Sequence, residues 1–365
     1  MKSYNEFMEY IKENVTDYLP ERFEEAEISI QQVVKNNDVV LDGLSIRNPD
    51  SNLSPNIYLN PLYEQYQKGR NLDELVSGIA DTYIENMEPI ENRTFQVQIE
   101  DIKNYEVVKG EIFPRLVNLE KNTTRLQNVP YTQREDLAIT YHVKVSGNRD
   151  SIGSLMITNE LMEVYGVTKE KLHTQAMENM ERLSPPVFLP LGEMIVDVMT
   201  EDFGRNEGVS QEEAKEYVKD MIPTGGPNVY CLTNQYKMNG AVGIMSESIQ
   251  QMVADRVGGD YYVLPSSVHE VLIVPQSAGM DPEELTDMVN TVNEGCVMQD
   301  EILSDHVYQY DAKEHKLSLC APAKEMKQEQ TMEQNRQPAF EEKSIDATKP
   351  PEQSHEPIKH SGRSH

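Results

Sequence analysis

The chain has 365 residues, with 62 acidic and 33 basic side chains and a formal net charge of −29. This length suggests about two domains, and the acidic balance argues against direct nucleic-acid binding, which depends on lysine and arginine at phosphates. No stretch has the roughly 18 uncharged apolar residues of a membrane span, and the N-terminus lacks the apolar region of a signal peptide. We therefore expect a soluble cytoplasmic protein that does not bind membranes.

The three cysteines, Cys231, Cys296 and Cys320, are an odd number at wide spacing. This pattern favours reduced thiols and offers neither a disulfide framework nor a zinc ribbon. Signatures of nucleotide binding and of common hydrolases are absent from the sequence, so we expect no cofactor.

Residues 1–90 predict an N-terminal module in the order helix, strands, two helices. Ser3 and Glu6 have the spacing of a capping box, and apolar residues recur at helical spacing until Pro20. Two β-branched runs, 28–34 and 39–46, flank a polar turn and predict a hairpin.

Residues 91–320 predict an α+β domain. Alternation over 137–145 indicates a strand with one buried face; a second strand follows at 152–157, and then a helix begins at Thr158. The segments 229–232 and 241–245, followed by a helix from Ser246, repeat this layout. They suggest an internal hairpin-helix duplication, although shared helix-capping residues explain the likeness equally well.

The fold class is predicted to be α+β, with mixed or antiparallel sheets and flanking helices, because strands with short connections alternate with helices. Residues 321–365 are rich in Gln, Glu, Lys, Pro and Ser, and their few large apolar residues lie far apart. Such a composition cannot bury enough surface to offset chain entropy, so we predict a disordered tail.

Three parts of the sequence carry a family resemblance: IYLNPLY at 57–63, YHV at 141–143 with MITN at 156–159, and YVLPSSVHEV at 262–271. They resemble an uncharacterised bacterial family known as domain of unknown function 5688. The resemblance extends over nearly all of the predicted folded part and implies an accessory role. It implies no catalytic residue, substrate or cofactor.

The strongest polar cluster consists of Ser266, Ser267, His269 and Glu270, between two apolar strands. A histidine beside a carboxylate and hydroxyls can act as general base for a nucleophile such as Cys231. In a regular strand, however, His269 and Glu270 point to opposite faces. A strand-end turn with a hydrogen-bonded histidine explains the same residues.

The segment 202–213 has part of the ligand spacing of a calcium-binding EF-hand loop. Its candidate ligands are Asp202, Asn206, Ser210 and Glu213. The third position is Gly204, which has no ligand atom, and the sixth is Glu207 where a sharp turn requires glycine. An acidic surface loop that ends in a Ser210 and Glu213 capping box explains the pattern without a metal, and we expect none.

The expected function is an accessory protein that acts by binding another protein, and the strongly negative net charge favours a basic partner. One alternative is a hydrolase or transferase that uses Cys231 or His269. A second alternative is an acidic decoy that occupies the site of a nucleic-acid-binding protein. The sequence alone leaves open whether the protein is an enzyme.

Overall fold

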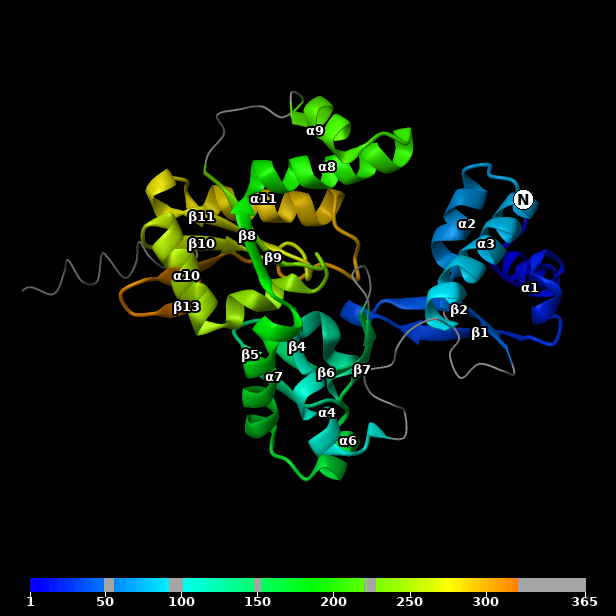
Figure 1. Cartoon of the computed structure of the whole chain (residues 1–365), viewed down its shortest axis with the longest axis horizontal. Coiled ribbons are helices and arrows are strands. Elements are labelled where there is room, and N and C mark those ends of the chain that lie inside the picture. Colours follow the sequence, from blue (N-terminus) through cyan, green and yellow to red (C-terminus); the bar gives the residue numbers. More distant parts are fainter. Residues whose placement is uncertain (49–55, 92–100, 148–151, 220, 222–227, 321–365) are drawn as a thin grey trace, which may run out of the picture. The chain divides into compact units, whose positions relative to one another are not determined.

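The computed structural model describes residues 1–48, 56–91, 101–147, 152–219, 221 and 228–320. Figure 1 shows an α+β fold with three sheets and helices packed on them, and every strand pairing among the described residues is antiparallel. The predicted fold class is therefore confirmed. The predicted disordered tail, 321–365, lies outside the described residues. Within the described part, no helix combines the length and apolar character that crossing a membrane requires.

The first sheet has the strand order β1–β2–β3, and the N-terminal helices pack on it. Its region contains α1 (Tyr4–Asn14), η1 (Val15–Tyr18), η2 (Glu21–Phe23), β1 (Glu27–Val34), η3 (Asn36–Asp38), β2 (Val40–Arg47), β3 (Asn56–Tyr58), α2 (Leu59–Gln67) and α3 (Leu72–Glu91). The predicted hairpin and the capping box at Ser3 and Glu6 are confirmed. These elements share a separate apolar core around Phe7 and Tyr83. The module boundary predicted after residue 90 falls at the end of α3, next to residues 92–100, which the structure does not describe.

The second sheet is centred on β6, which pairs with β4 on one edge and with β5 and β7 on the other. Its region contains α4 (Tyr105–Val108), η5 (Lys109–Glu111), β4 (Ile112–Asn118), η6 (Glu120–Asn122), α5 (Thr123–Leu126), β5 (Tyr131–Arg134), β6 (Leu137–Gly147), β7 (Ile152–Met156), α6 (Asn159–Tyr165) and α7 (Lys169–Leu183).

The prediction that the strand over 137–145 has a single buried face is wrong. Ile139 and Tyr141 face the main core, but Thr140 and His142, on the opposite face, are buried as well. On this second face Ala138 packs with Leu126 of α5 and Val129, and His142 lines a cavity shared with the tip of the β1–β2 hairpin and Val268. Alternating polar residues thus mark a polar interface inside the protein rather than a solvent-exposed face.

The third sheet has the order β13–β12–β10–β11–β9–β8. Its region contains β8 (Pro186–Pro190), α8 (Leu191–Glu207), α9 (Gln211–Lys219), β9 (Tyr230–Asn234), η7 (Gly240–Met245), α10 (Glu247–Val257), β10 (Tyr261–Leu264), β11 (Val271–Pro275), η8 (Gln276–Ala278), α11 (Pro282–Gly295), β12 (Tyr308–Asp311) and β13 (Lys316–Leu319). The strand predicted over 241–245 is wrong, because this segment forms the 3-10 helix η7. The second segment of the proposed duplication therefore has no hairpin like that of β6 and β7.

The two faces of the third sheet contact different parts of the protein. Val263 and Ile273 belong to the main core, which also contains residues of β4, β6, α7 and α10. Their neighbours Leu264 and Val274 point the other way and pack against α11. This alternation places Cys231, whose register partner in β11 is Leu272, on the α11 side of the sheet.

Candidate functional site

The segment between β10 and β11 carries four of the five predicted catalytic residues. Its backbone is tied to neighbouring segments: Gly240 N donates to His269 O at 2.9 Å, Val268 N to Glu301 O at 2.9 Å, and Ser304 N to Pro265 O at 3.0 Å. The Ser267 hydroxyl accepts from His269 N at 3.0 Å, which is the predicted strand-end turn. A segment fixed at so many points holds its side chains in defined directions.

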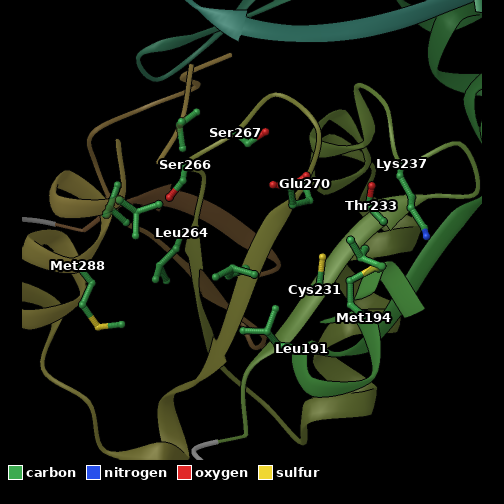
Figure 2. A pocket seen from close by; sticks show the side chains of 15 residues that line it. Leu191, Met194, Cys231, Thr233, Lys237, Leu264, Ser266, Ser267, Glu270 and Met288 are labelled. Carbon is green, nitrogen blue, oxygen red and sulfur yellow. The ribbon is translucent and has the colours of Figure 1, made fainter. Parts of the chain in front are cut away.

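Four of the five predicted catalytic residues line one cavity of about 380 Å³ (Figure 2). These are Cys231 from β9 together with Ser266, Ser267 and Glu270 from the segment between β10 and β11. The remaining wall is mostly apolar and comes from α8, α11 and the sheet, with lining residues Leu191, Met194, Val198, Leu264, Leu272, Met288, Val289, Val292 and Val297. We call this cavity the apolar groove.

The polar end of the apolar groove is poorly suited to nucleophilic chemistry near neutral pH. Burial raises the pKa of the Cys231 thiol to about 12, and the Glu270 carboxylate adds to the shift. Burial also raises the pKa of Glu270, while the nearby His269 acts in the opposite direction. A thiol with this pKa stays protonated at pH 7, and the thiolate is the reactive form of cysteine.

His269 points away from the apolar groove and lines a different cavity. Its Nδ1 accepts a hydrogen bond from Asn239 N at 3.2 Å, and its Nε2 lies 3.2 Å from Glu301 Oε1. The backbone donor requires an unprotonated Nδ1, so the neutral ring carries its proton on Nε2, facing Glu301. The structure therefore does not bring His269 together with Cys231.

The residues of the calcium hypothesis do not form a loop. Asp202 lies inside α8, and Ser210 and Glu213 form a capping box at the start of α9, with Glu213 N donating to Ser210 Oγ at 3.3 Å and Ser210 N to Glu213 Oε2 at 3.2 Å. The side chain of Asn206 is outside the described part. Among the described residues, no cluster of three His, Cys, Asp or Glu side chains is arranged to hold a metal ion.

Sequence reasoning did not indicate that α8 and α11 form a groove with the sheet. Val198 of α8 and Met288 and Val292 of α11 line it and remain 40%, 49% and 39% exposed. Thr233 and Lys237 line it too, and Lys237 Nζ pairs with Glu201 Oε1 at 3.1 Å. Both α8 and α11 carry more apolar side chains than the core buries, and this excess is visible in the sequence. The pattern of a helix does not, however, show which element the helix packs against.

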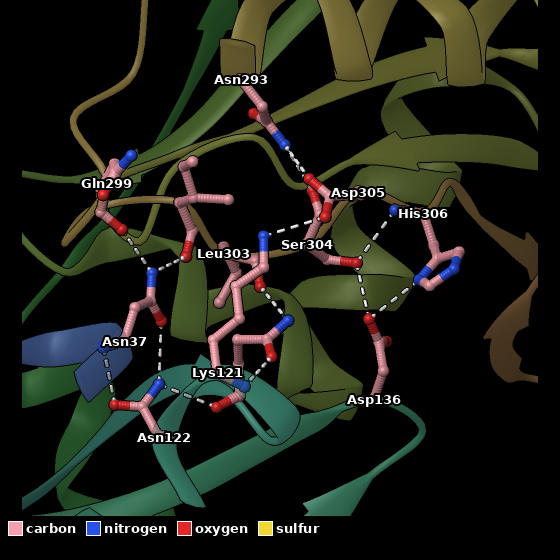
Figure 3. A network of polar contacts seen from close by, with 12 residues as sticks. Asn37, Lys121, Asn122, Asp136, Asn293, Gln299, Leu303, Ser304, Asp305 and His306 are labelled. Atoms are coloured by element: carbon pink, nitrogen blue, oxygen red, sulfur yellow. Dashed lines mark hydrogen bonds and ion pairs between the residues drawn. The ribbon is translucent and has the colours of Figure 1, made fainter. Parts of the chain in front are cut away.

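A second missed feature is a polar network that joins distant segments (Figure 3). Ser304 Oγ donates to Asp136 Oδ2 at 2.7 Å, and His306 Nδ1 lies 3.1 Å from the same oxygen. Tyr308 also donates to Asp136. Although serine, histidine and aspartate meet here, the serine proton goes to the aspartate and not to the histidine. The cluster lacks the geometry of a nucleophile activated by a base, and it joins β12 to the turn before β6.

A family model described as a family of unknown function, DUF5688, matches residues 4–312, so the chain belongs to that family. The resemblance found in the sequence is thereby confirmed. No curated protein and no solved structure matches the chain.

Proposed function

We propose that this protein is a cytoplasmic accessory protein that binds another protein, and that the apolar groove holds a basic amphipathic segment of that partner. The observation that carries the proposal is the groove itself, with its volume of about 380 Å³ and its largely apolar wall. Exposed apolar side chains along a groove are typical of surfaces that bind the apolar face of a partner helix.

The methionines of the groove support binding of a protein segment. Met194 and Met288 project from opposite helices, α8 and α11. Methionine is unbranched and polarisable, so it adapts to partner side chains of different shapes.

The charge around the groove supports a basic occupant. The helix α11 has four acidic residues, Glu283, Glu284, Asp287 and Glu294, and no basic residue. Glu284 lies one turn before Met288 on the same side of the helix. On α8, Glu193 and Asp202 are exposed. Lysine or arginine beside the apolar positions of a partner would complement these carboxylates.

The alternative of a hydrolase or transferase has less support. Burial keeps the Cys231 thiol protonated, and His269, the base that the sequence predicts, faces another cavity. The decoy alternative depends on charge alone and leaves the apolar wall of the groove without a role.

A peptide titration tests the proposal. An 18-residue amphipathic peptide of leucine and lysine, labelled with fluorescein, is titrated with the full-length chain and followed by anisotropy. We expect saturable binding that weakens with salt, and no binding of a matched peptide of leucine and glutamate. The variant Val198→Lys places a cation in the groove and should lower the affinity at least ~10-fold. The matched control is Val164→Lys on α6, where the side chain is already 57% exposed.

Two results would contradict the proposal. One is equal binding of the acidic and basic peptides, and the other is unchanged affinity in Val198→Lys. A chain ending at Cys320 extends the test. If its affinity rose by ~10-fold or more, the chain's own C-terminal residues would compete for the groove and the assigned occupant would be wrong.

A further inference from the structure

A second cavity, of about 270 Å³, has the opposite chemical character to the apolar groove. It lies between the tip of the β1–β2 hairpin, strands β4 and β6, and residues 300–301. Its lining includes Lys35, Arg115, Arg125, His142, His269 and Glu301. We call it the cationic cavity, and the following inference is independent of the proposed protein-binding function.

Arg115 enters this cavity without a carboxylate partner. Its Nη2 donates to Ser154 Oγ at 2.8 Å, and its guanidinium lies over the Phe113 ring, 5.5 Å from the centroid. The Nε atom is buried and has no hydrogen-bond partner among the described residues. A buried guanidinium with an unused donor is costly unless a counter-charge is present.

Arg125 is positioned by a carboxylate that does not pair with its side chain. Asp38 accepts the backbone N–H of Thr124 at 2.7 Å and that of Arg125 at 3.1 Å. The carboxylate therefore holds the start of α5, and no described carboxylate forms an ion pair with the Arg125 guanidinium. Burial lowers the pKa of Arg125, and the charge of Asp38 acts in the opposite direction.

The two arginines also repel each other. Burial, and then the charge of Arg125, lower the pKa of Arg115 to about 10. Both guanidiniums nevertheless remain charged at neutral pH, so the cost of burying them persists. His142 does not add to the charge, because burial lowers its pKa well below the usual value.

The acidic groups in the wall do not balance these cations. Glu301 lies 3.2 Å from the neutral ring of His269, so Glu301 and Asp300 both count as acidic lining residues. Lys35, Arg115 and Arg125 are the cations opposite them. The described part of the wall therefore has one more cation than it has carboxylates, and the Asp38 carboxylate, outside the wall, acts on Arg125.

The architecture around the cavity is built to keep the cations together. Asn37 Nδ2 donates to Gln299 O at 2.8 Å and to Ile302 O at 2.7 Å (Figure 3), and Asn36 Nδ2 donates to Asp300 O at 2.9 Å. Asn37 N also donates to Asn122 Oδ1 at 2.9 Å, just before α5. These bonds fix the hairpin backbone next to Lys35, whose Nζ lies 4.7 Å from the centroid of the Tyr58 ring, and the segment just before α5, which carries Arg125.

We propose that the cationic cavity binds a phosphate group, with Arg115, Arg125 and Lys35 as its ligands. The planar guanidinium matches the geometry of phosphate oxygens, and Arg115 and Arg125 both line the cavity. The phosphate is either the inorganic ion or the terminal group of a small phosphorylated metabolite, because both present the same dianion.

Calorimetric titration of the full-length chain at constant ionic strength tests the site, with inorganic phosphate in one arm and ribose 5-phosphate in the other. Binding of both ligands with similar affinity assigns the site to the free ion, and tighter binding of ribose 5-phosphate assigns it to a phosphorylated metabolite. Arg125→Gln should lower the affinity at least ~10-fold. The matched control Arg134→Gln, at an exposed arginine on β5, should leave it unchanged. Failure of both ligands to bind, or full affinity in Arg125→Gln, would overturn the proposal.

A stability measurement tests the same claim without relying on affinity. In phosphate-free buffer, Arg115→Met removes an unpaired buried cation and keeps an apolar stem, so its unfolding midpoint should exceed that of the wild type. At saturating phosphate, the order should reverse because only the wild type gains from binding. A lower midpoint for Arg115→Met in phosphate-free buffer would show that the charge is already compensated, and the proposal would fail.

Discussion

The apolar groove and the cationic cavity receive side chains from the same short segment, yet they have opposite characters. Ser267 and Glu270 line the groove, whereas Val268 and His269 line the cationic cavity. The groove has an apolar wall beneath acidic helices, and the cavity has arginines without carboxylate partners. Residues that are adjacent in this segment therefore contribute to different sites. Cys231 and His269, a plausible catalytic pair in the sequence, belong to separate sites.

The largest effect on stability and binding is expected at Gly240, which lies against both β9 and the His269 segment. A Cβ on Gly240 would lie 2.6 Å from Asn234 N, 2.6 Å from Thr233 Oγ1 and 2.7 Å from His269 O. Two of these atoms are backbone, so Gly240→Ala forces β9 away from the His269 segment. We expect a loss of about 3 kcal/mol in the free energy of unfolding, measured by urea denaturation, and weaker binding at both sites.

The matched control for this substitution is Gly192→Ala in α8, where an added Cβ meets nothing within 4 Å. Alanine there should stabilise the helix by about 0.5–1 kcal/mol. If Gly240→Ala were as stable as the wild type, the close approach of β9, η7 and the His269 segment would be wrong.

A substitution at the tip of the β1–β2 hairpin should weaken binding at the cationic cavity and leave binding at the apolar groove unchanged. Asn37 has a φ of 59°, which glycine adopts readily, so Asn37→Gly removes the side-chain hydrogen bonds without backbone strain. We expect a loss of about 2 kcal/mol in unfolding free energy. Phosphate affinity should fall, while peptide affinity at the groove should stay unchanged.

Glu135→Gly, at another non-glycine residue with positive φ, is the control for Asn37→Gly and should be close to neutral in stability. Equal phosphate affinity in Asn37→Gly and the wild type would contradict the role assigned to the hairpin tip. A parallel loss of peptide binding would show that the two sites are not separate.

The smallest effect is a pH dependence at the polar end of the groove. Burial raises the pKa of Glu270, so the folded state binds this proton more tightly than the unfolded state does. The contribution of this group to stability is present in full below the unfolded pKa and is lost as the pH rises through the raised folded value. Glu270→Gln should therefore be more stable than the wild type at pH 8, and the difference should shrink as the pH falls toward 4.5. A difference that grew with acidification would reverse the assigned shift.

Local patterns predicted much of the fold, because capping and alternation are short-range signals. The capping boxes at Ser3 and Ser210 and the strands β10 and β11 all follow from residues a few positions apart. The error at 241–245 arose because a five-residue apolar run fits a strand and a short helix equally well.

The sites themselves could be predicted only in part. Cys231 and Glu270 meet because β9 pairs with β11, a long-range pairing that no local pattern determines. The cationic cavity is harder still, since Asn37 reaches Ile302 across 265 positions of sequence. In the sequence, Arg115 and Arg125 look like ordinary surface charges, and only the folded chain places them together.

The most direct test of the central claim is a methyl NMR titration of the full-length chain carrying ¹³C-methyl methionine, with resonances assigned by substitution. The leucine and lysine peptide should shift the methyl resonances of Met194 and Met288, which line the groove, and leave Met8 and Met87 of the N-terminal core unchanged. Shifts that spare Met194 and Met288, or no shifts at saturating peptide, would contradict the assignment of the apolar groove as the binding site for a partner protein.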